Sequence, residues 1–143
     1  MALIGITLDT TREYVSDLDP AKGSDEATVF VLGTLDSRIF GMIRDKATTM
    51  SVDPTDPNGE VNTTINVNEV AFTTAMYGLK GWKNFRDGKG NDIKFATIKR
   101  THGNQSYTVV DPEVLKRLPS VVIMELAEQI KTDNDVSEDA AKN

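Results

Sequence analysis

The chain has 143 residues, 38% of them hydrophobic and 27% charged, which is typical of one folded domain and excludes a wholly disordered chain. It contains no cysteine, so disulfides, thiolate catalysis, zinc ribbons and iron–sulfur ligation are excluded. Acidic residues outnumber basic ones by 22 to 16, and the net charge of −6 predicts no general attraction to nucleic acid or anionic lipid.

The N-terminal segment, residues 2–8, is apolar and carries Leu3, Ile4 and Ile6. An exposed apolar edge invites aggregation, so such a segment pairs within its own sheet or with the sheet of a neighbour. We favour a strand of its own sheet and keep an arm between subunits as the alternative. The segment lacks the positive charge and length of a signal peptide, and no run approaches the roughly 20 apolar residues of a membrane span, so we expect a cytoplasmic product.

The next elements are a polar loop, a buried strand and a helix. Residues 12–25 have loop composition, and residues 27–32 form an apolar, β-branched run that predicts a strand. Apolar residues then recur at helical spacing up to Ala47, with Asp36 or Ser37 as the N-cap. Gly41 inside this helix weakens it by roughly 1 kcal/mol relative to alanine.

Residues 48–65 read as a long loop, with a short edge strand at residues 63–65. Long loops without structure are uncommon in compact domains unless they are functional or gain order from a partner. The acidic and amide side chains of this segment suggest a calcium loop at first sight, namely Asp53, Asp56, Asn58 and Glu60. Their spacing does not match such a loop, so we expect no metal site.

The strongest local pattern is a helix over residues 67–79, with Asn66 and Glu69 as a capping box. Gly78 and Gly81 end it, and an aromatic pair, Trp82 and Phe85, follows on a bend. Residues 87–92 have turn composition and lead into a strand over residues 93–98. We expect the aromatic pair to close the core, with an interface role as the alternative.

The rest of the chain predicts a strand over residues 107–110, a short helix that begins at Asp111 and Pro112, and a longer helix from Pro119 to about Thr132. Residues 133–143 read as an acidic tail. The whole is an α+β domain over residues 1–132, in which a small, mainly antiparallel sheet is packed by two to four helices. The sheet would comprise residues 27–32, 93–98 and 107–110.

No group in the sequence is arranged for catalysis. His102 is the only histidine and lies in a turn, and Gly88-Lys89-Gly90 lacks the rest of a phosphate loop. We therefore expect no enzyme, no cofactor and no small-molecule substrate. Residues 80–100 interleave basic and aromatic side chains, so a small nucleic-acid-binding module is an alternative function.

A resemblance extends from about Ala27 to the C-terminus. It rests on GLKGWKNF at residues 78–85, and on spaced residues after it: Asp87, Gly90, Phe95, Leu118-Pro119, Glu125-Leu126, Ser137-Glu138 and Lys142-Asn143. This pattern resembles small structural and assembly proteins of tailed bacteriophages, including tail assembly chaperones. The resemblance implies a non-enzymatic virion subunit of the tail or head–tail connector, made in the host cytoplasm, or alternatively a transient tail assembly chaperone.

Its partners would be copies of itself and other phage structural proteins, without membrane or nucleic acid. Phage connectors are closed rings of head-to-tail contacts, for which arms and long loops are natural donors. We therefore expect the N-terminal segment and the long loop to carry contacts between subunits. The candidate interface residues are Leu3, Ile4, Ile6, Val52, Asp53, Asp56, Asn58, Trp82 and Phe85.

Overall fold

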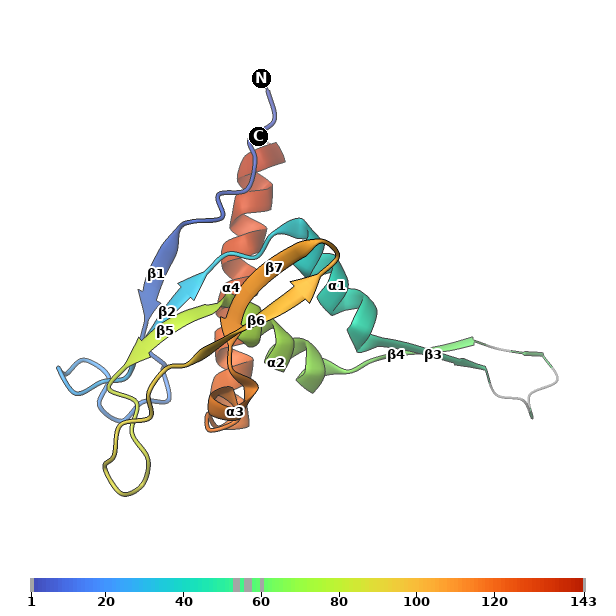
Figure 1. Cartoon of the computed structure of the whole chain (residues 1–143). Helices are drawn as coiled ribbons and strands as arrows, with labels where there is room; N and C mark the ends of the chain where they lie inside the picture. The colour runs from blue at the N-terminus through green and yellow to red at the C-terminus, as the bar shows by residue number, and fades with distance from the viewer. Residues whose placement is uncertain (1, 53–54, 56–57, 60, 143) are drawn as a thin grey trace.

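The structure is a computed structural model that describes residues 2–52, 55, 58–59 and 61–142. Within these residues, the strands form one three-stranded antiparallel sheet and two separate hairpins, and helices pack around them (Figure 1). This confirms the predicted α+β class with small antiparallel sheets. The three strands predicted to share one sheet are instead divided between the three-stranded sheet and a hairpin.

The three-stranded sheet has β2 (Val29–Gly33) between β1 (Thr11–Tyr14) and β5 (Leu79–Lys83). Phe30 and Leu32 of β2 are buried, as expected for alternate residues on the inner face of a strand. The predicted loop at residues 12–25 is wrong at its start, where β1 lies. The bend predicted after the helix at residues 67–79 is likewise a strand, β5. Both segments pair with β2, which supplies backbone partners that a local pattern does not reveal.

The two helices at the centre of the chain lie where the sequence placed them. In α1 (Ser37–Ala47), Asp36 Oδ1 accepts a hydrogen bond from the Ile39 N–H at 2.7 Å. The capping box predicted for α2 (Val67–Gly78) is wrong, because the Asn66 side chain makes no capping hydrogen bond. The backbone at Asn66 has a ψ of 89°, against 161° at the Asp36 cap, so it departs from the extended conformation usual for a cap.

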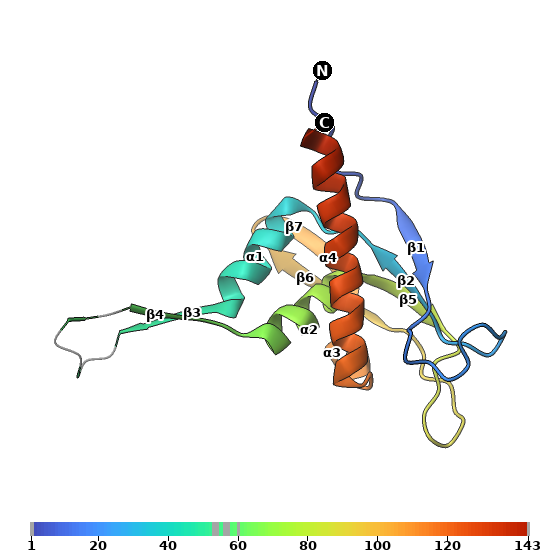
Figure 2. The same ribbon diagram turned by 180° about the vertical axis from the view of Figure 1, so that it is seen from behind.

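The longest helix, α4 (Ser120–Lys142), packs along α2 and the sheet (Figure 2). Its Leu126 and Ile130 side chains are fully buried, and Ala75 is buried opposite them on α2. A Cβ atom at Gly78 would lie 2.6 Å from Ile130 Cδ1. The small residues of α2 therefore allow α4 to approach closely.

Helix α4 continues to Lys142, so the prediction of an acidic tail from residue 133 onward is wrong for the described residues. Two residues in this segment contact the body of the protein. Asp133 pairs with Arg12 at 2.7 Å, and the Asn134 side chain is 1% exposed. These contacts extend the helix beyond the apolar stripe that sequence periodicity detects.

The segment predicted as a long loop contains a hairpin of β3 (Thr48–Val52) and β4 (Val61–Ile65). It projects from the body between α1 and α2 (Figures 1 and 2). The strand predicted at residues 63–65 is confirmed, and the loop prediction is wrong for the rest of both strands. Threonine and valine favour strands, and a ribbon that projects from the body needs no apolar face toward a core.

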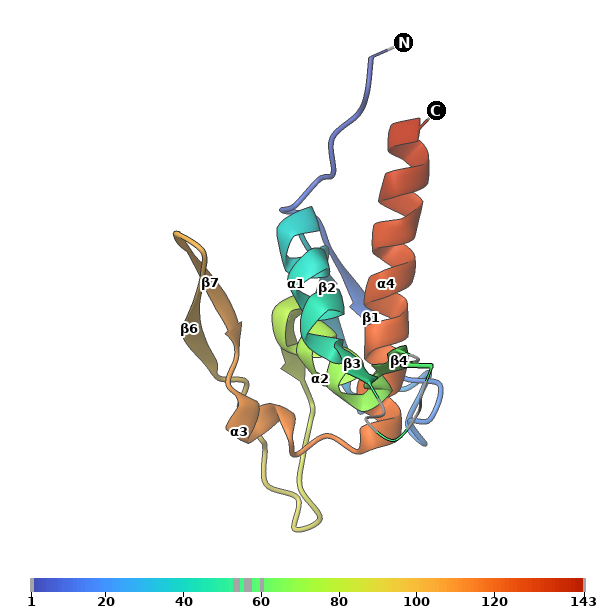
Figure 3. The ribbon, with the colours of Figure 1, turned by 90° about the vertical axis from the view of Figure 1, so that its right-hand side faces the viewer.

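A second hairpin, β6 (Thr97–His102) and β7 (Gln105–Val110), leads into α3 (Pro112–Leu115). Figure 3 shows this hairpin on one side of the molecule and α4 on the other, with α1 and α2 between them. The strand predicted at residues 93–98 begins only at Thr97. Helix α3 begins as predicted, since Asp111 Oδ1 accepts a hydrogen bond from the Glu113 N–H at 3.0 Å.

Candidate functional site

The N-terminal segment leaves the body as an extended arm (Figure 3). Residues 2–7 have no secondary structure, so the prediction of a strand in the protein's own sheet is wrong for them. The chain bends at Leu8 and Asp9 and joins the sheet only at β1. At the base of the arm, the Thr34 hydroxyl donates a hydrogen bond to the Thr7 carbonyl at 2.7 Å.

The arm exposes large apolar side chains. Leu3 is 89% exposed, Ile4 57% and Leu8 54%, whereas Ile6 is half-buried. Contiguous exposed apolar surface on a folded protein marks an interaction site more often than scattered single residues do. The arm therefore brings together three of the predicted interface residues, Leu3, Ile4 and Ile6.

Contacts between β1 and α4 hold the base of the arm. The Arg12 guanidinium donates hydrogen bonds to Asp133 Oδ2 and Gln129 Oε1, each at 2.7 Å. It also lies over the Tyr14 ring, 5.4 Å from the ring centroid. The arm thus begins from a rigidly attached strand.

Glu125 of α4 joins the segment after β1 through three hydrogen bonds. It accepts them from the Tyr14 hydroxyl at 2.7 Å, from the Ser16 hydroxyl, and from the Asp17 N–H at 2.9 Å. Burial alone would raise the pKa of Glu125, but these donors outweigh it and lower the pKa. Burial and the bond to Glu125 raise the pKa of Tyr14 to about 12.

The hairpin of β3 and β4 carries the second group of predicted interface residues. Val52 lies at the end of β3 opposite Val61, and Asn58 is exposed between the strands. Asp53 and Asp56 lie outside the described residues. The hairpin therefore places Val52 and Asn58 away from the core and from the arm.

An apolar groove lies at the base of this hairpin, where α1, α2 and α4 meet. Its volume is about 370 Å³, and Val67 and Met124, exposed by 57% and 38%, open it to solvent. The sequence does not predict this groove, because it forms only where three helices that are separate in the sequence meet. The one sequence signal for the groove is Met124, an apolar residue beside the buried face of α4. The lining residues are Phe40, Ile43, Arg44, Thr48, Val67, Val70, Ala71, Thr74, Met124, Ala127, Glu128 and Lys131.

The aromatic pair belongs to the packed body. The half-buried Trp82 ring meets Phe30, Phe85 and Phe95 edge to face, with centroid distances of 6.5, 5.2 and 4.9 Å. The Trp82 Nε1–H also donates a hydrogen bond to the Ile93 carbonyl at 2.7 Å. A nucleic acid base could stack here only by displacing one of these rings.

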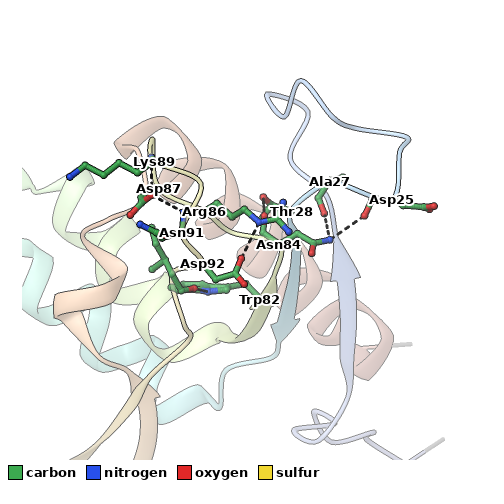
Figure 4. A network of polar contacts seen from close by, with 11 residues as sticks. Asp25, Ala27, Thr28, Trp82, Asn84, Arg86, Asp87, Lys89, Asn91 and Asp92 are labelled. Atoms are coloured by element: carbon green, nitrogen blue, oxygen red, sulfur yellow. Dashed lines mark hydrogen bonds and ion pairs between the residues drawn. The ribbon is translucent and has the colours of Figure 1, made fainter.

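Asn84, which lies between the two aromatic residues, is held by polar contacts (Figure 4). Asn84 has a φ of 60°, a conformation that asparagine tolerates better than most residues. Its Nδ2 donates hydrogen bonds to the Asp25 and Ala27 carbonyls at 3.2 and 3.1 Å. The Asn84 carbonyl accepts one from the Thr28 hydroxyl at 2.8 Å. These contacts join the chain between the two aromatic residues to the segment before β2.

Several side chains of the basic segment, residues 80–100, already have partners. Arg86 Nε lies 3.0 Å from Asp92 Oδ1, and Lys83 Nζ lies 3.9 Å from Glu13 Oε1. The Lys80 ammonium donates a hydrogen bond to the Tyr77 carbonyl at 2.9 Å, and burial lowers its pKa. These contacts distribute the basic groups among local partners.

The turn within this segment is closed by Asp87. Its Oδ1 accepts hydrogen bonds from the Lys89 and Asn91 N–H groups at 2.9 and 3.0 Å, and these backbone donors lower its pKa. Gly90 has a φ of 83°, which glycine adopts without strain. The Gly88-Lys89-Gly90 motif therefore forms a structural turn.

His102 is the last residue of β6, pairs with Gln105 and is half-buried, so the prediction that it lies in a turn is wrong. In the described part of the chain, no three His, Cys, Asp or Glu side chains gather as a metal site would require.

No helix formed by the described residues has both the length and the apolarity needed to cross a membrane.

The chain matches no known family model, no curated protein and no solved structure.

Proposed function

We propose that this chain is a non-enzymatic structural protein of a tailed bacteriophage, a repeated subunit of the tail or head–tail connector. The observation that carries the proposal is the exposed apolar arm at residues 2–8, in which Leu3 is 89% exposed. Burying a large aliphatic side chain gains roughly 1.5–3 kcal/mol. The apolar side chains of the arm stay exposed in the single chain, so their burial against a partner would favour binding.

The directions of the projecting segments support a repeated subunit. The arm extends beyond the N-terminal end of α1, and the hairpin of β3 and β4 extends from its C-terminal end (Figure 1). A subunit of a head-to-tail ring needs two different faces that complement each other. These two segments supply contacts on different sides of one body.

The resemblance to small phage proteins supports the proposal that the particle is a tailed bacteriophage. Its most specific stretch, residues 78–85, runs from the end of α2 through β5. There Gly78 contacts α4 and Trp82 holds the aromatic cluster. The residues that carry the resemblance thus lie in the packed body. The arm and the hairpin lie outside it and are free of this packing role.

The test is quantitative proteomics of purified particles, together with a native mass of the isolated protein. A fixed copy number in the particle and self-association in solution are the expected results. Absence from particles, combined with binding to a tail protein in infected cells, would replace this proposal with a transient tail assembly chaperone. Association with single-stranded nucleic acid alone would favour a nucleic-acid-binding module.

A further inference from the structure

The groove between α1, α2 and α4 has the length of a short extended peptide. Its wall on α4 runs from Met124 to Lys131, and its wall on α2 from Val67 to Thr74. At about 1.5 Å per helical residue, each wall is about 10 Å long. An extended chain crosses that length with about three residues, at roughly 3.3 Å per residue.

The chemistry of the groove suits an uncharged apolar ligand. Its charged lining residues, Arg44, Glu128 and Lys131, are exposed, and the other lining side chains are apolar or threonine. A charged ligand buried against the apolar wall would lose hydration with little compensation. An aliphatic ligand would instead remove the exposed surface of Val67 and Met124 from water.

The arm has the matching chemistry and spacing. Residues 2–8 carry no charge. In an extended conformation Ile4, Ile6 and Leu8 lie on one side and Leu3 on the other, because successive side chains alternate. Ile4 and Ile6 are then about 7 Å apart, which fits within the groove.

The arm of the same chain points away from this groove. Its base is tied to Thr34 through Thr7, near the N-terminal end of α1, whereas the groove lies toward the C-terminal end of α1. In Figure 1 the arm runs upward from the body, whereas the hairpin of β3 and β4 projects to the right, and Figure 3 again shows the arm running upward. To enter its own groove, the arm would have to reverse at Thr7.

We propose that the groove receives the N-terminal arm of a second copy of this chain, with Ile4 and Ile6 inserted between α2 and α4. The inference rests on the function proposed above and adds the receptor surface to it. Donor and acceptor surfaces differ, so the contact is heterologous and repeats from one copy to the next.

Cross-linking tests this contact cleanly, because the natural chain has no cysteine. Leu3→Cys protein is mixed with Met124→Cys protein and treated with a short bismaleimide. The matched control replaces the Met124→Cys protein with Val121→Cys protein, since Val121 is on the same helix, is 60% exposed and does not line the groove. The groove pair should give about tenfold more mixed dimer, because docking raises the effective concentration of the two thiols.

A second pair of variants checks the result without cross-linking. Met124→Glu should weaken self-association of the full-length chain about tenfold by sedimentation, because it places a charge in the apolar groove. Val121→Glu should leave self-association unchanged. Both sites are exposed, so circular dichroism should report an intact fold for each variant.

Three outcomes would overturn the inference. Cross-linking only within a Leu3→Cys/Met124→Cys double variant would assign the groove to the arm of the same chain. Equal yields from the groove and control pairs, in a natural chain that still self-associates, would remove the groove and leave the proposed function intact. A natural chain that stays monomeric, gives no mixed dimer and is absent from particles would end both proposals.

Discussion

Asn134 on α4 and Leu35, between β2 and α1, are joined by a pair of hydrogen bonds. Asn134 Oδ1 accepts one from the Leu35 N–H at 3.2 Å, and Asn134 Nδ2 donates one to the Leu35 carbonyl at 2.8 Å. The Asn134 side chain is 1% exposed, so it replaces water for both backbone groups. Leu35 follows Thr34, whose hydroxyl holds the base of the arm, so this pair connects α4 to the site where the arm leaves.

Replacing Asn134 with leucine should lower the free energy of unfolding by roughly 2–4 kcal/mol, because two buried backbone groups lose their partners. Urea unfolding followed by circular dichroism measures this loss. Asp135→Leu is the matched control, since Asp135 is the next residue on the helix and is exposed. Equal, small losses for both variants would show that the pair adds little stability.

Two helical glycines should respond to alanine in opposite directions. In α1, a Cβ atom at Gly41 has no neighbour within 4 Å, so Gly41→Ala should stabilise the protein by up to about 1 kcal/mol. At the end of α2, a Cβ atom at Gly78 would lie 2.6 Å from Ile130 Cδ1, so Gly78→Ala should destabilise it by roughly 1–3 kcal/mol.

Thermal or urea unfolding of the two variants gives the comparison directly. Ile130→Val in the Gly78→Ala background should recover only a small part of the loss, because it removes the Cδ1 methyl group but keeps Cγ2, which would lie 2.8 Å from the new Cβ. Stabilisation by Gly78→Ala would contradict the close approach of α2 and α4.

The hydrogen bonds of Glu125 should make stability depend on acid pH. Its pKa in the folded protein is lowered from the ordinary 4.5, so its stabilising contribution is present above about pH 4.5 and is lost as the pH falls through the folded pKa. Glu125→Gln should therefore be less stable than the natural chain at neutral pH. That difference should shrink as the pH falls.

Tyr14 should make stability depend on alkaline pH, because its pKa rises from 10.0 to about 12 on folding. A raised pKa stabilises the fold fully below pH 10.0, and this contribution is lost as the pH rises through about 12. Tyr14→Phe should lack that loss. Urea unfolding at several pH values tests both predictions. If the unfolding free energies of Glu125→Gln and Tyr14→Phe depend on pH as that of the natural chain does, Glu125 and Tyr14 do not have these roles.

Trp82→Ala should destabilise the fold by roughly 3–5 kcal/mol, since it removes a ring that meets three others and leaves a cavity. Trp82→Phe should cost about 1 kcal/mol through the lost hydrogen bond to the Ile93 carbonyl. Urea unfolding measures both changes. A Trp82→Ala protein that keeps its stability but does not assemble would place the ring at an interface, where aromatic anchors concentrate binding energy.

The parts of the fold that sequence reasoning found are those with a local cause. Asp36 caps α1 and Asp111 caps α3, and both signals lie within a few residues of the helix they start. The apolar run that becomes β2 is equally local. Propensity, capping and short-range periodicity suffice for such elements.

The missed parts have nonlocal causes. β1 has a polar sequence and is a strand because β2 offers it a partner, and α4 continues because Asn134 finds the Leu35 backbone. The groove is assembled from three helices, so the apolar stripe of any single helix does not predict it. Trp82 packs in the body as the local pattern predicts, but one of the rings that it meets, Phe30, is distant in sequence and no local pattern identifies it.

The most direct test of the assembly proposal is the copy number of the chain in purified particles, measured for the natural chain and for a chain lacking residues 2–8. Residues 2–7 lie outside every helix and strand, so the deletion should leave helix content and unfolding free energy near normal. The account predicts a fixed copy number for the natural chain and loss of the shortened chain from particles. A folded, shortened chain that enters particles at the natural copy number would contradict it.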